Sequence, residues 1–351
     1  MRLLDPLFGW EAVEYALAAR LGRKRARALV AAACERLRQG HHDLYQELAA
    51  EPELAEALPE LAPLFDPTHN LGQSEPLVRR ALAAHDSTPA TRTLQLAHQK
   101  IGYELKGSAT APVVVLAHAL GANLTLWDAQ TVALTPHFRV LRYDLRGHGQ
   151  TSTPTGAYTL DQLGNDVVAL LDSLGVPRVH FCGISLGGLI GLWLGLHAPE
   201  RLHSLVLANT AARIDSEQSW NERILQVRQN GLAPLIEPTL DRWLSPATRH
   251  RCPGVARAAR AMIAATPTQG YLGCCAVLRD TDLRQQIAAI RLPTLIIAGR
   301  EDESTPTQQA RFLAAEIPGA RFAELDTAHI SSLGAAPQFN DELRRFWGIG
   351  E

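Results

Sequence analysis

Ser185 lies in the stretch HFCGISLGGL (residues 180–189), with one glycine two positions before it and another two positions after it. The apolar run ahead of the serine is typical of a buried strand, and the Leu- and Gly-rich run behind it is typical of a helix. A serine in the pattern G-x-S-x-G at such a strand-to-helix turn holds its hydroxyl clear of the sheet. Side chains at Gly183 and Gly187 would collide with neighbouring backbone, so both positions must be small. We therefore expect Ser185 to be a nucleophile, the alternative being an incidental serine in a glycine-rich turn.

A serine hydroxyl needs a general base before it can attack a carbonyl carbon. On this kind of turn the partners follow the serine in chain order, first an acid and then a histidine. Of the thirteen histidines, His329 in LDTAHISSLG is the one beyond the last predicted strands. His197, His203 and His250 follow Ser185 but precede the candidate acid. We expect His329 to be the base, with a surface loop histidine as the alternative.

The acid is expected in the loop after an earlier strand, and PTLIIAGREDESTP places Asp302 three residues after a strand-ending glycine. A carboxylate there would hold the imidazole of His329 in one tautomer and stabilise its positive charge. Glu301 and Glu303 are close rivals. Asp326 is a further rival, but it is too near His329 in sequence to reach across comfortably. We favour Asp302.

The negative charge that develops on an attacked carbonyl oxygen needs two N–H donors. Leu186 opens the helix after the serine, where unpaired amides and the helix dipole favour negative charge. The second donor is expected in the loop after an early strand, in LAHALGANLTLWD, at the backbone of Leu120. Position alone supports this pair, because backbone donors leave no signature in the sequence.

The elements needed to position these groups are short apolar strands alternating with helices after about residue 95. Continuous apolar strands of this kind predict a mostly parallel sheet with helices on both faces. The rhythm breaks between about 211 and 285, where helical patterns predict a lid over the sheet. Trp127 and Trp220 are candidate pocket walls, although tryptophans more often fill a core. The sequence thus predicts a serine hydrolase of the α/β-hydrolase class, with a helical lid.

Three nearby features are expected to be structural. Arg146 and His148 in DLRGHG would shape the loop beside the site, and Cys182 would pack on the strand that leads to the serine. Cys274 and Cys275 are adjacent, which is poor geometry for a metal ion, so both are expected to be small apolar side chains of the lid. We expect no metal and no organic cofactor.

The composition is that of a globular protein, with 46% hydrophobic and 20% charged residues and a formal net charge of -2. This charge argues against nucleic acid as a partner. The five cysteines form neither a disulfide framework nor a metal-binding pattern. The N-terminus lacks a signal-peptide pattern and no apolar run approaches the length of a membrane span, so we expect a cytoplasmic protein without membrane contact.

Residues 1–86 have a different pattern, with Ala, Leu and Arg at helical spacing and few β-branched residues. Helices are expected in WEAVEYALAARLG, KRARALVAAACERLRQG, DLYQELAAEP and EPLVRRALAAH. We therefore predict a helical region over 1–86, a linker over 87–94 and the α/β-hydrolase domain over 95–351.

HFCGISLGGLIGLWLGLHAPERLHSLVLANTAARI and GYLGCCAVLRDTDLRQQIAAIRLPTLIIAGREDESTP strongly resemble 3-oxoadipate enol-lactonases, over about residues 93–351. The resemblance implies hydrolysis of 3-oxoadipate enol-lactone, a step in the β-ketoadipate pathway of aromatic degradation, in its protocatechuate or catechol branch. This substrate carries a free carboxylate, so a cation is expected nearby, with Arg223 and Arg279 as guesses. The chain has AHALG and HISSLG where the family often has SNSLG and HISNLE; neither departure removes a predicted catalytic residue.

The stretch from ALAARLGRKRARALV to SEPLVRRALA resembles the C-terminal end of 3-carboxy-cis,cis-muconate cycloisomerase, of the fumarase/aspartase superfamily. That enzyme acts earlier in the same pathway. The catalytic serine loop of that family lies upstream of the matching segment, so we expect no cycloisomerase activity. Self-association or docking through these N-terminal helices is the role left open.

Two other functions stay open. One is a different activity on the same scaffold, namely a carboxylesterase, a C–C bond hydrolase or a cofactor-free perhydrolase, because fold alone cannot separate these. The other is an inactive binding or scaffold protein, against which the combination of Ser185, Asp302 and His329 argues. Dehalogenases and epoxide hydrolases of this class are disfavoured, because they have an aspartate at the position of Ser185.

Overall fold

The chain divides into two units, Met1–Pro89 and Ala90–Glu351. The computed structural model describes residues 91–350 except 97 and 98, together with positions 17, 25, 26, 28, 29, 32, 33, 48, 51 and 54. In the first unit the described positions between 17 and 33, and Leu48, are helical, and they fall within the first three stretches where helices are expected. The fourth predicted helix, in EPLVRRALAAH, lies outside the described residues.

Eight strands of the second unit form one sheet, in the order β1-β2-β4-β3-β5-β6-β7-β8. The strands are β1 (Arg92–Gln95), β2 (Lys100–Lys106), β3 (Val113–Ala117), β4 (Arg139–Tyr143), β5 (Val179–Ile184), β6 (Leu202–Ala208), β7 (Thr294–Gly299) and β8 (Arg321–Leu325). β2 pairs antiparallel with both β1 and β4, and all the other neighbours are parallel. The carboxyl ends of β3 to β8 therefore meet at one edge of the sheet.

Alternate residues of each strand face opposite sides of the sheet, which explains the continuous apolar strand sequences. Val115 of β3 belongs to the buried cluster on one face, while Val114 and Leu116 belong to the cluster on the other face. The helices outside the insertion described next are α6 (Asp128–Leu134), α7 (Leu160–Ser173), α8 (Leu186–His197), α14 (Thr307–Glu316), α15 (Ser331–Gly334) and α16 (Ala336–Trp347). Short 3-10 turns are η3 (Leu124–Trp127), η4 (Pro199–Arg201), η5 (Ala233–Leu235) and η6 (Ile287–Ala289).

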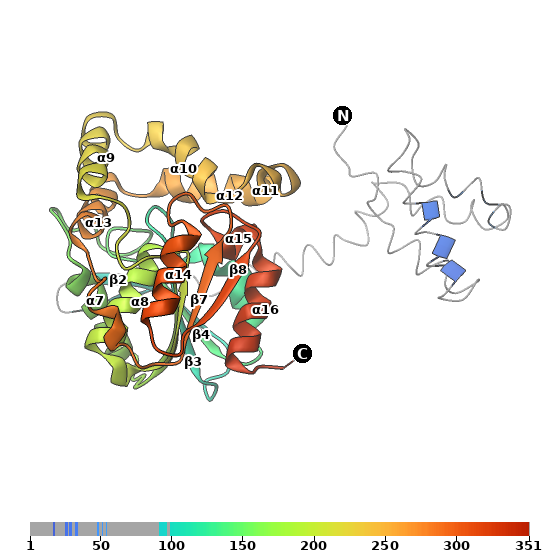
Figure 1. The fold of residues 1–351 in the computed structure, drawn as a ribbon, viewed down its shortest axis with the longest axis horizontal. Helices are drawn as coiled ribbons and strands as arrows, with labels where there is room; N and C mark the ends of the chain where they lie inside the picture. Colours follow the sequence, from blue (N-terminus) through green and yellow to red (C-terminus); the bar gives the residue numbers. More distant parts are fainter. Residues whose placement is uncertain are drawn as a thin grey trace. The chain divides into compact units, whose positions relative to one another are not determined.

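The helical insertion between β6 and β7, residues 211–285, lies over the carboxyl edge of the sheet (Figure 1). Its helices are α9 (Glu217–Asn230), α10 (Ile236–Trp243), α11 (Pro246–Arg251), α12 (Pro253–Ala265) and α13 (Thr268–Asp280). α9 begins at Ser216, whose hydroxyl accepts a hydrogen bond from the Ser219 amide and so caps the helix. α13 packs against α9 and contributes to the main core.

Two sequence expectations can be compared with these boundaries. β1 begins at Arg92, so residues 92–94 belong to the sheet and not to the predicted linker, because they pair with 101–103 of β2. In the described part of the chain no single helix is long and apolar enough to span a membrane; α12 and α13 meet that criterion only together, and they are bent by 94° relative to each other. The mostly parallel sheet with helices between its strands, predicted from the sequence, is confirmed.

Candidate active site

Ser185 is the residue between β5 and α8, and its backbone has the positive φ expected of a sharp strand-to-helix turn (φ 57°, ψ −117°). The two flanking glycines are required by close backbone contacts. A Cβ atom on Gly183 would lie 2.1 Å from the carbonyl oxygen of Gly187, and one on Gly187 would lie 2.2 Å from that of Ala117. The turn therefore depends on both glycines and presents the Ser185 hydroxyl at the carboxyl edge of the sheet.

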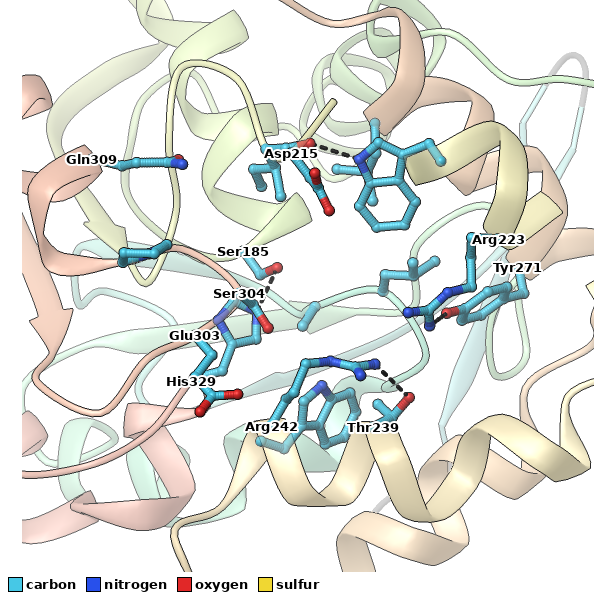
Figure 2. Close-up of a pocket in the computed structure, with 17 residues that line it drawn as sticks. Ser185, Asp215, Arg223, Thr239, Arg242, Tyr271, Glu303, Ser304, Gln309 and His329 are labelled. Carbon is cyan, nitrogen blue, oxygen red and sulfur yellow. Dashed lines mark hydrogen bonds between the residues drawn. The ribbon is translucent and has the colours of Figure 1, made fainter. Parts of the chain in front are cut away.

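The structure brings Ser185, His329 and Asp302 together from the ends of three different strands. Ser185 Oγ lies 2.9 Å from His329 Nε2 (Figure 2). On the other side of the ring, His329 Nδ1 lies 3.0 Å from Asp302 Oδ1 and 2.9 Å from Oδ2. All three residues are buried. This is the geometry in which a histidine can take the proton of a serine while a carboxylate orients the imidazole.

Asp302 is held in place by donors other than His329. Its Oδ1 accepts hydrogen bonds from the backbone amides of Ser304 and Thr305, both at 2.9 Å, and its Oδ2 accepts one from the Thr305 hydroxyl at 2.7 Å. Burial alone would raise the pKa of Asp302, but the charge of His329 and the hydrogen bonds from His329, the Thr305 amide and Asn209 lower it to about 2. Asp302 is therefore ionised throughout the neutral range.

Asn209 is a member of this network that sequence reasoning missed. It directly follows β6 with a positive φ of 44°, donates from Nδ2 to Asp302 Oδ2 at 2.9 Å, and accepts from the Ser331 hydroxyl at 2.5 Å. The signal was a polar residue at the carboxyl end of a buried parallel strand, in LVLANT. Such positions meet the other strand ends at one edge of the sheet.

The rival acids lie elsewhere. Asp326 forms an ion pair with Arg300 at the surface, and its side chain is 77% exposed. Glu301 is exposed as well. Glu303 lines the cavity but has no hydrogen bond to His329 among the described residues. All four candidates carry a carboxylate, so it is the position of Asp302 in the loop after β7 that brings its side chain to His329.

The two amides predicted to stabilise an oxyanion flank the serine. Leu186 N–H is the first amide of α8, and Leu120 lines the same cavity as Ser185. Within the described part of the chain neither amide has an acceptor, in contrast to the amides of Gly121 and Gly188 beside them. Two unsatisfied donors beside a nucleophile are suited to an oxygen that gains negative charge.

Ser185 opens into a cavity of about 480 Å³ between the strand ends and the helical insertion. This volume is within the range of sites for small molecules. The cavity is lined by Ala119, Leu120, Ser185, Ile214, Asp215, Trp220, Arg223, Thr239, Arg242, Trp243, Tyr271, Leu278, Glu303, Ser304, Pro306, Gln309 and His329.

Two half-buried arginines of the insertion, Arg223 on α9 and Arg242 on α10, turn their guanidinium groups toward each other across one end of the cavity (Figure 2). Arg223 donates to Tyr271 Oη at 3.4 Å, and Arg242 donates to Thr239 Oγ1 at 3.3 Å. Among the described residues neither forms an ion pair. Burial and the neighbouring charge of Arg223 lower the pKa of Arg242. Two cations that repel each other in a cavity provide a site for an anion.

Of the four residues predicted to form the substrate pocket, Trp220 and Arg223 line the cavity, and two others do not. Trp127 is fully buried in the core and does not line the cavity; its ring lies 6.0 Å from that of Phe339, measured between ring centroids. Arg279 is turned away from the cavity and forms an ion pair with Asp280. Arg242, which sequence reasoning missed, lies at the cavity instead. Nothing in IEPTLDRW distinguished it from a surface arginine.

The loop of DLRGHG has the supporting role expected from the sequence. Arg146 forms a two-pronged ion pair with Asp166 of α7, at 2.9 and 2.7 Å. His148 is fully buried and accepts a hydrogen bond from the amide of Gly121 at 3.0 Å. Cys182 and Cys274 are buried as well, and burial raises the pKa of both thiols.

Comparison with known proteins identifies the class of this chain. Residues 112–336 match the family described as alpha/beta hydrolase fold. The chain therefore belongs to the α/β-hydrolase family, which confirms the expectation of a hydrolase. Residues 6–81 match a different family, described as Adenylosuccinate lyase C-terminus.

Comparison with individual proteins shows which members of this family the chain resembles. The chain is 38% identical to 3-oxoadipate enol-lactonase 2 of Acinetobacter baylyi, over 71% of this chain and 93% of the relative. The solved enol-lactonase from Burkholderia xenovorans is 37% identical with a TM-score of 0.72, covering 73% of this chain and all of that one. A hydrolase from Pseudomonas aeruginosa is 43% identical with a TM-score of 0.73, covering 75% of this chain and all of that one. The resemblance to enol-lactonases is thereby confirmed.

Proposed function

We propose that this chain hydrolyses 3-oxoadipate enol-lactone to 3-oxoadipate, as a step of the β-ketoadipate pathway of aromatic degradation. Ser185 is the nucleophile, His329 the general base and acid, and Asp302 the group that orients His329. The observation that carries the proposal is a single cavity with the serine at its floor and two arginines without acidic partners at one end. The similarity to enol-lactonases supports the choice of substrate.

In the proposed reaction Ser185 Oγ attacks the lactone carbonyl carbon while its proton moves to His329 Nε2. The carbonyl oxygen becomes an oxyanion that accepts hydrogen bonds from the amides of Leu120 and Leu186. The ring C–O bond then breaks, and the leaving enolate takes the proton and becomes a ketone. Water, deprotonated by His329, attacks the acyl-serine and releases 3-oxoadipate. Asp302, with its pKa of about 2, stays ionised and stabilises the imidazolium in both halves of the reaction.

The arginines account for the other end of the substrate. The enol-lactone carries a free carboxylate, which Arg223 and Arg242 would bind while the ring carbonyl lies at Ser185. An anion between the two guanidinium groups would also relieve their mutual repulsion. Trp220 and Tyr271 supply the aromatic walls beside these cations.

The test is spectrophotometric loss of the enol-lactone with the wild-type chain and with Ser185→Ala. We expect turnover by the wild type and a loss of at least about 10⁴-fold in the variant, since removing the nucleophile removes covalent catalysis. A Cys182→Ser variant, three residues before Ser185 on β5, serves as a control for damage to this strand. Equal rates in wild type and Ser185→Ala would refute the mechanism.

The alternative functions can be distinguished by combining this assay with labelling by a fluorophosphonate probe. A carboxylesterase or C–C bond hydrolase would react with a fluorophosphonate probe at Ser185 but would turn over the enol-lactone poorly. An inactive scaffold protein would not react with the probe. The cations at the cavity favour an anionic substrate over a neutral ester.

We also propose that residues 1–86 are a separate helical region with no cycloisomerase activity and are available for self-association or docking. The family match over 6–81 and the division of the chain after residue 89 support this. Clear cycloisomerase turnover by the purified chain would contradict it.

A further inference from the structure

His118, directly after β3, is a fully buried histidine next to the loop that supplies the Leu120 amide. Its Nδ1 lies 2.8 Å from the carbonyl oxygen of Ala119, and its Nε2 lies 3.0 Å from the amide of Leu145. A carbonyl can only accept and an amide can only donate, so Nδ1 carries the proton and Nε2 carries the lone pair. The ring is therefore neutral, in a single tautomer. Its complete burial and the adjacent imidazole of His148 lower its pKa well below 6.5, in agreement with this assignment.

The carbonyl that His118 binds belongs to the same peptide group as the Leu120 amide. A trans peptide is planar, and its C=O and N–H bonds point in opposite directions. The described residues contain no cis peptide bond. The oxygen of Ala119 also accepts a hydrogen bond from the amide of Ala122 at 3.1 Å, so the ring of His118 and this turn together hold the oxygen and direct the Leu120 N–H away from the ring. Ala119 and Leu120 both line the cavity that holds Ser185.

The next peptide group is fixed in the same way. His148 donates from Nδ1 to the carbonyl of Arg146 at 3.1 Å, and its Nε2 accepts from the amide of Gly121 at 3.0 Å. The two imidazoles contact each other, with ring centroids 5.3 Å apart. The peptide groups before and after Leu120 are thus each held by a buried neutral histidine. Of these two peptide groups, the amide of Gly121 has an acceptor, while the amide of Leu120 has none among the described residues.

We propose that His118 is a positioning residue for the reaction: its Nδ1–H, by holding the Ala119 carbonyl, aims the Leu120 amide at the oxyanion. This inference rests on the proposed function only in so far as it needs Ser185 to attack a carbonyl or phosphonyl centre. His118 touches no reacting atom. It acts through one peptide group, so its contribution concerns the transition state and not the binding of the substrate.

The proposal assigns different roles to the two ring nitrogens of His118, and two substitutions test these roles separately. His118→Asn places an amide NH₂ near the position of Nδ1 and can still donate to Ala119. His118→Gln reaches the position of Nε2 and can still accept from Leu145, but it loses the bond to Ala119. We expect His118→Gln to lower kcat about 10- to 100-fold, as misaimed catalytic groups do, with KM nearly unchanged. His118→Asn is expected to retain most of the activity.

The rate of Ser185 phosphonylation by a fluorophosphonate gives a second readout, because the phosphonyl oxygen occupies the oxyanion position whatever the natural substrate is. It should fall with His118→Gln and persist with His118→Asn. A chain that reacts with the probe but ignores the enol-lactone would refute the proposed substrate while still testing His118. His180→Gln, at the far end of β5 where the ring bonds Ser204, is the matched control for loss of an imidazole. It should leave both rates unchanged.

An equal loss of kcat in His118→Asn and His118→Gln, or a larger loss in His118→Asn, would overturn the proposal. A role of His118 in packing alone does not depend on which ring nitrogen is replaced. If neither variant folds, the wild-type chain decides. Nitrogen–proton correlation spectra should then show His118 as the Nδ1–H tautomer at neutral pH, with Nε2 unprotonated. An Nε2–H tautomer or a charged ring would contradict the inference.

Discussion

The two sides of the cavity are built differently. At the carboxyl ends of the strands, the side chains of Ser185, His329 and Asp302 are joined by hydrogen bonds, and Asp302 also accepts from Asn209, Ser304 and Thr305. On the helical insertion, the arginines that face the cavity each have one long hydrogen bond to a hydroxyl and no acidic partner among the described residues. On the strand-end side the hydrogen bonds that join Ser185, His329 and Asp302 are formed without a ligand, and two backbone amides are left free beside the serine. On the insertion side two arginines are left without an anion.

This difference indicates a division of roles. Under the proposed function, the groups that act on any acyl substrate are held at the strand ends, where neighbouring strands determine their positions. Under the same proposal, the groups that select a substrate lie on the insertion, where Arg223 and Arg242 have no ion-pair partner among the described residues. Preorganisation favours the transition state, whereas a vacant pair of cations favours one class of ground-state ligand. Changes on the two sides should therefore have different kinetic signatures.

The largest effect is expected from Asp302→Asn on the strand-end side. The amide cannot stabilise the imidazolium of His329 and favours the wrong tautomer, so we expect kcat to fall by about 10³- to 10⁴-fold with KM little changed. Asp326→Asn, in the exposed ion pair with Arg300, is the matched control and should change neither constant. A loss confined to KM would show that Asp302 acts in binding and would break the comparison.

Acid should destabilise the strand-end side through its buried imidazoles. Burial lowers the pKa of His148 from 6.5 to about 4. Between these values the unfolded chain binds a proton that the folded chain does not, so stability is full above pH 6.5 and falls as the pH drops toward 4, by about 3 kcal/mol for this one residue. Denaturant unfolding at several pH values should show a smaller loss for His148→Gln, whose side-chain oxygen can still accept from Gly121. An unchanged slope would contradict the neutral buried state.

The sequence led to the three residues that the structure brings together at the strand ends, because the motif for this proposed chemistry is tied to chain order. G-x-S-x-G fixed Ser185, and the order of acid and histidine along later strands led to Asp302 and His329. Asn209 was not predicted as a site residue, because an amide side chain that only supports a carboxylate belongs to no sequence motif. It is recognisable only by lying at the end of a strand whose place in the sheet is known.

The insertion side could be predicted only in part. Its helices were evident from residues 211–285, but which of their side chains face the cavity depends on how each helix packs. Arg223 and Arg279 looked alike in the sequence, and the structure turns one toward Tyr271 and pairs the other with Asp280. The prediction for Trp127 was wrong for a related reason, since a tryptophan near a predicted site in the sequence can be buried in the core, as Trp127 is against Phe339.

Arg242→Met tests the insertion side directly. The thioether keeps much of the apolar stem but removes the charge, so kcat/KM for the carboxylate-bearing lactone should fall about 10- to 100-fold, mainly through KM. A neutral ester such as a nitrophenyl ester should lose little, because it has no carboxylate to bind. Arg223→Met should behave in the same way. Equal losses with the anionic and neutral substrates would mean that the arginines support the fold of the cavity and do not select the substrate.

The smallest effect is expected from Arg279→Gln. Arg279 lies on α13 within the insertion, yet its guanidinium group pairs with Asp280 at 2.6 and 2.8 Å and does not line the cavity. A partly exposed ion pair of this kind contributes little to stability. We therefore expect kcat/KM for the lactone to change by less than about twofold, in contrast to Arg242→Met on the same substrate. A loss as large as that of Arg242→Met would show that the net positive charge of the insertion, and not contact with the substrate, attracts the anion. Measuring kcat/KM of both variants at low and high ionic strength separates these two explanations. Salt screens a long-range attraction but screens a direct contact in the cavity much less.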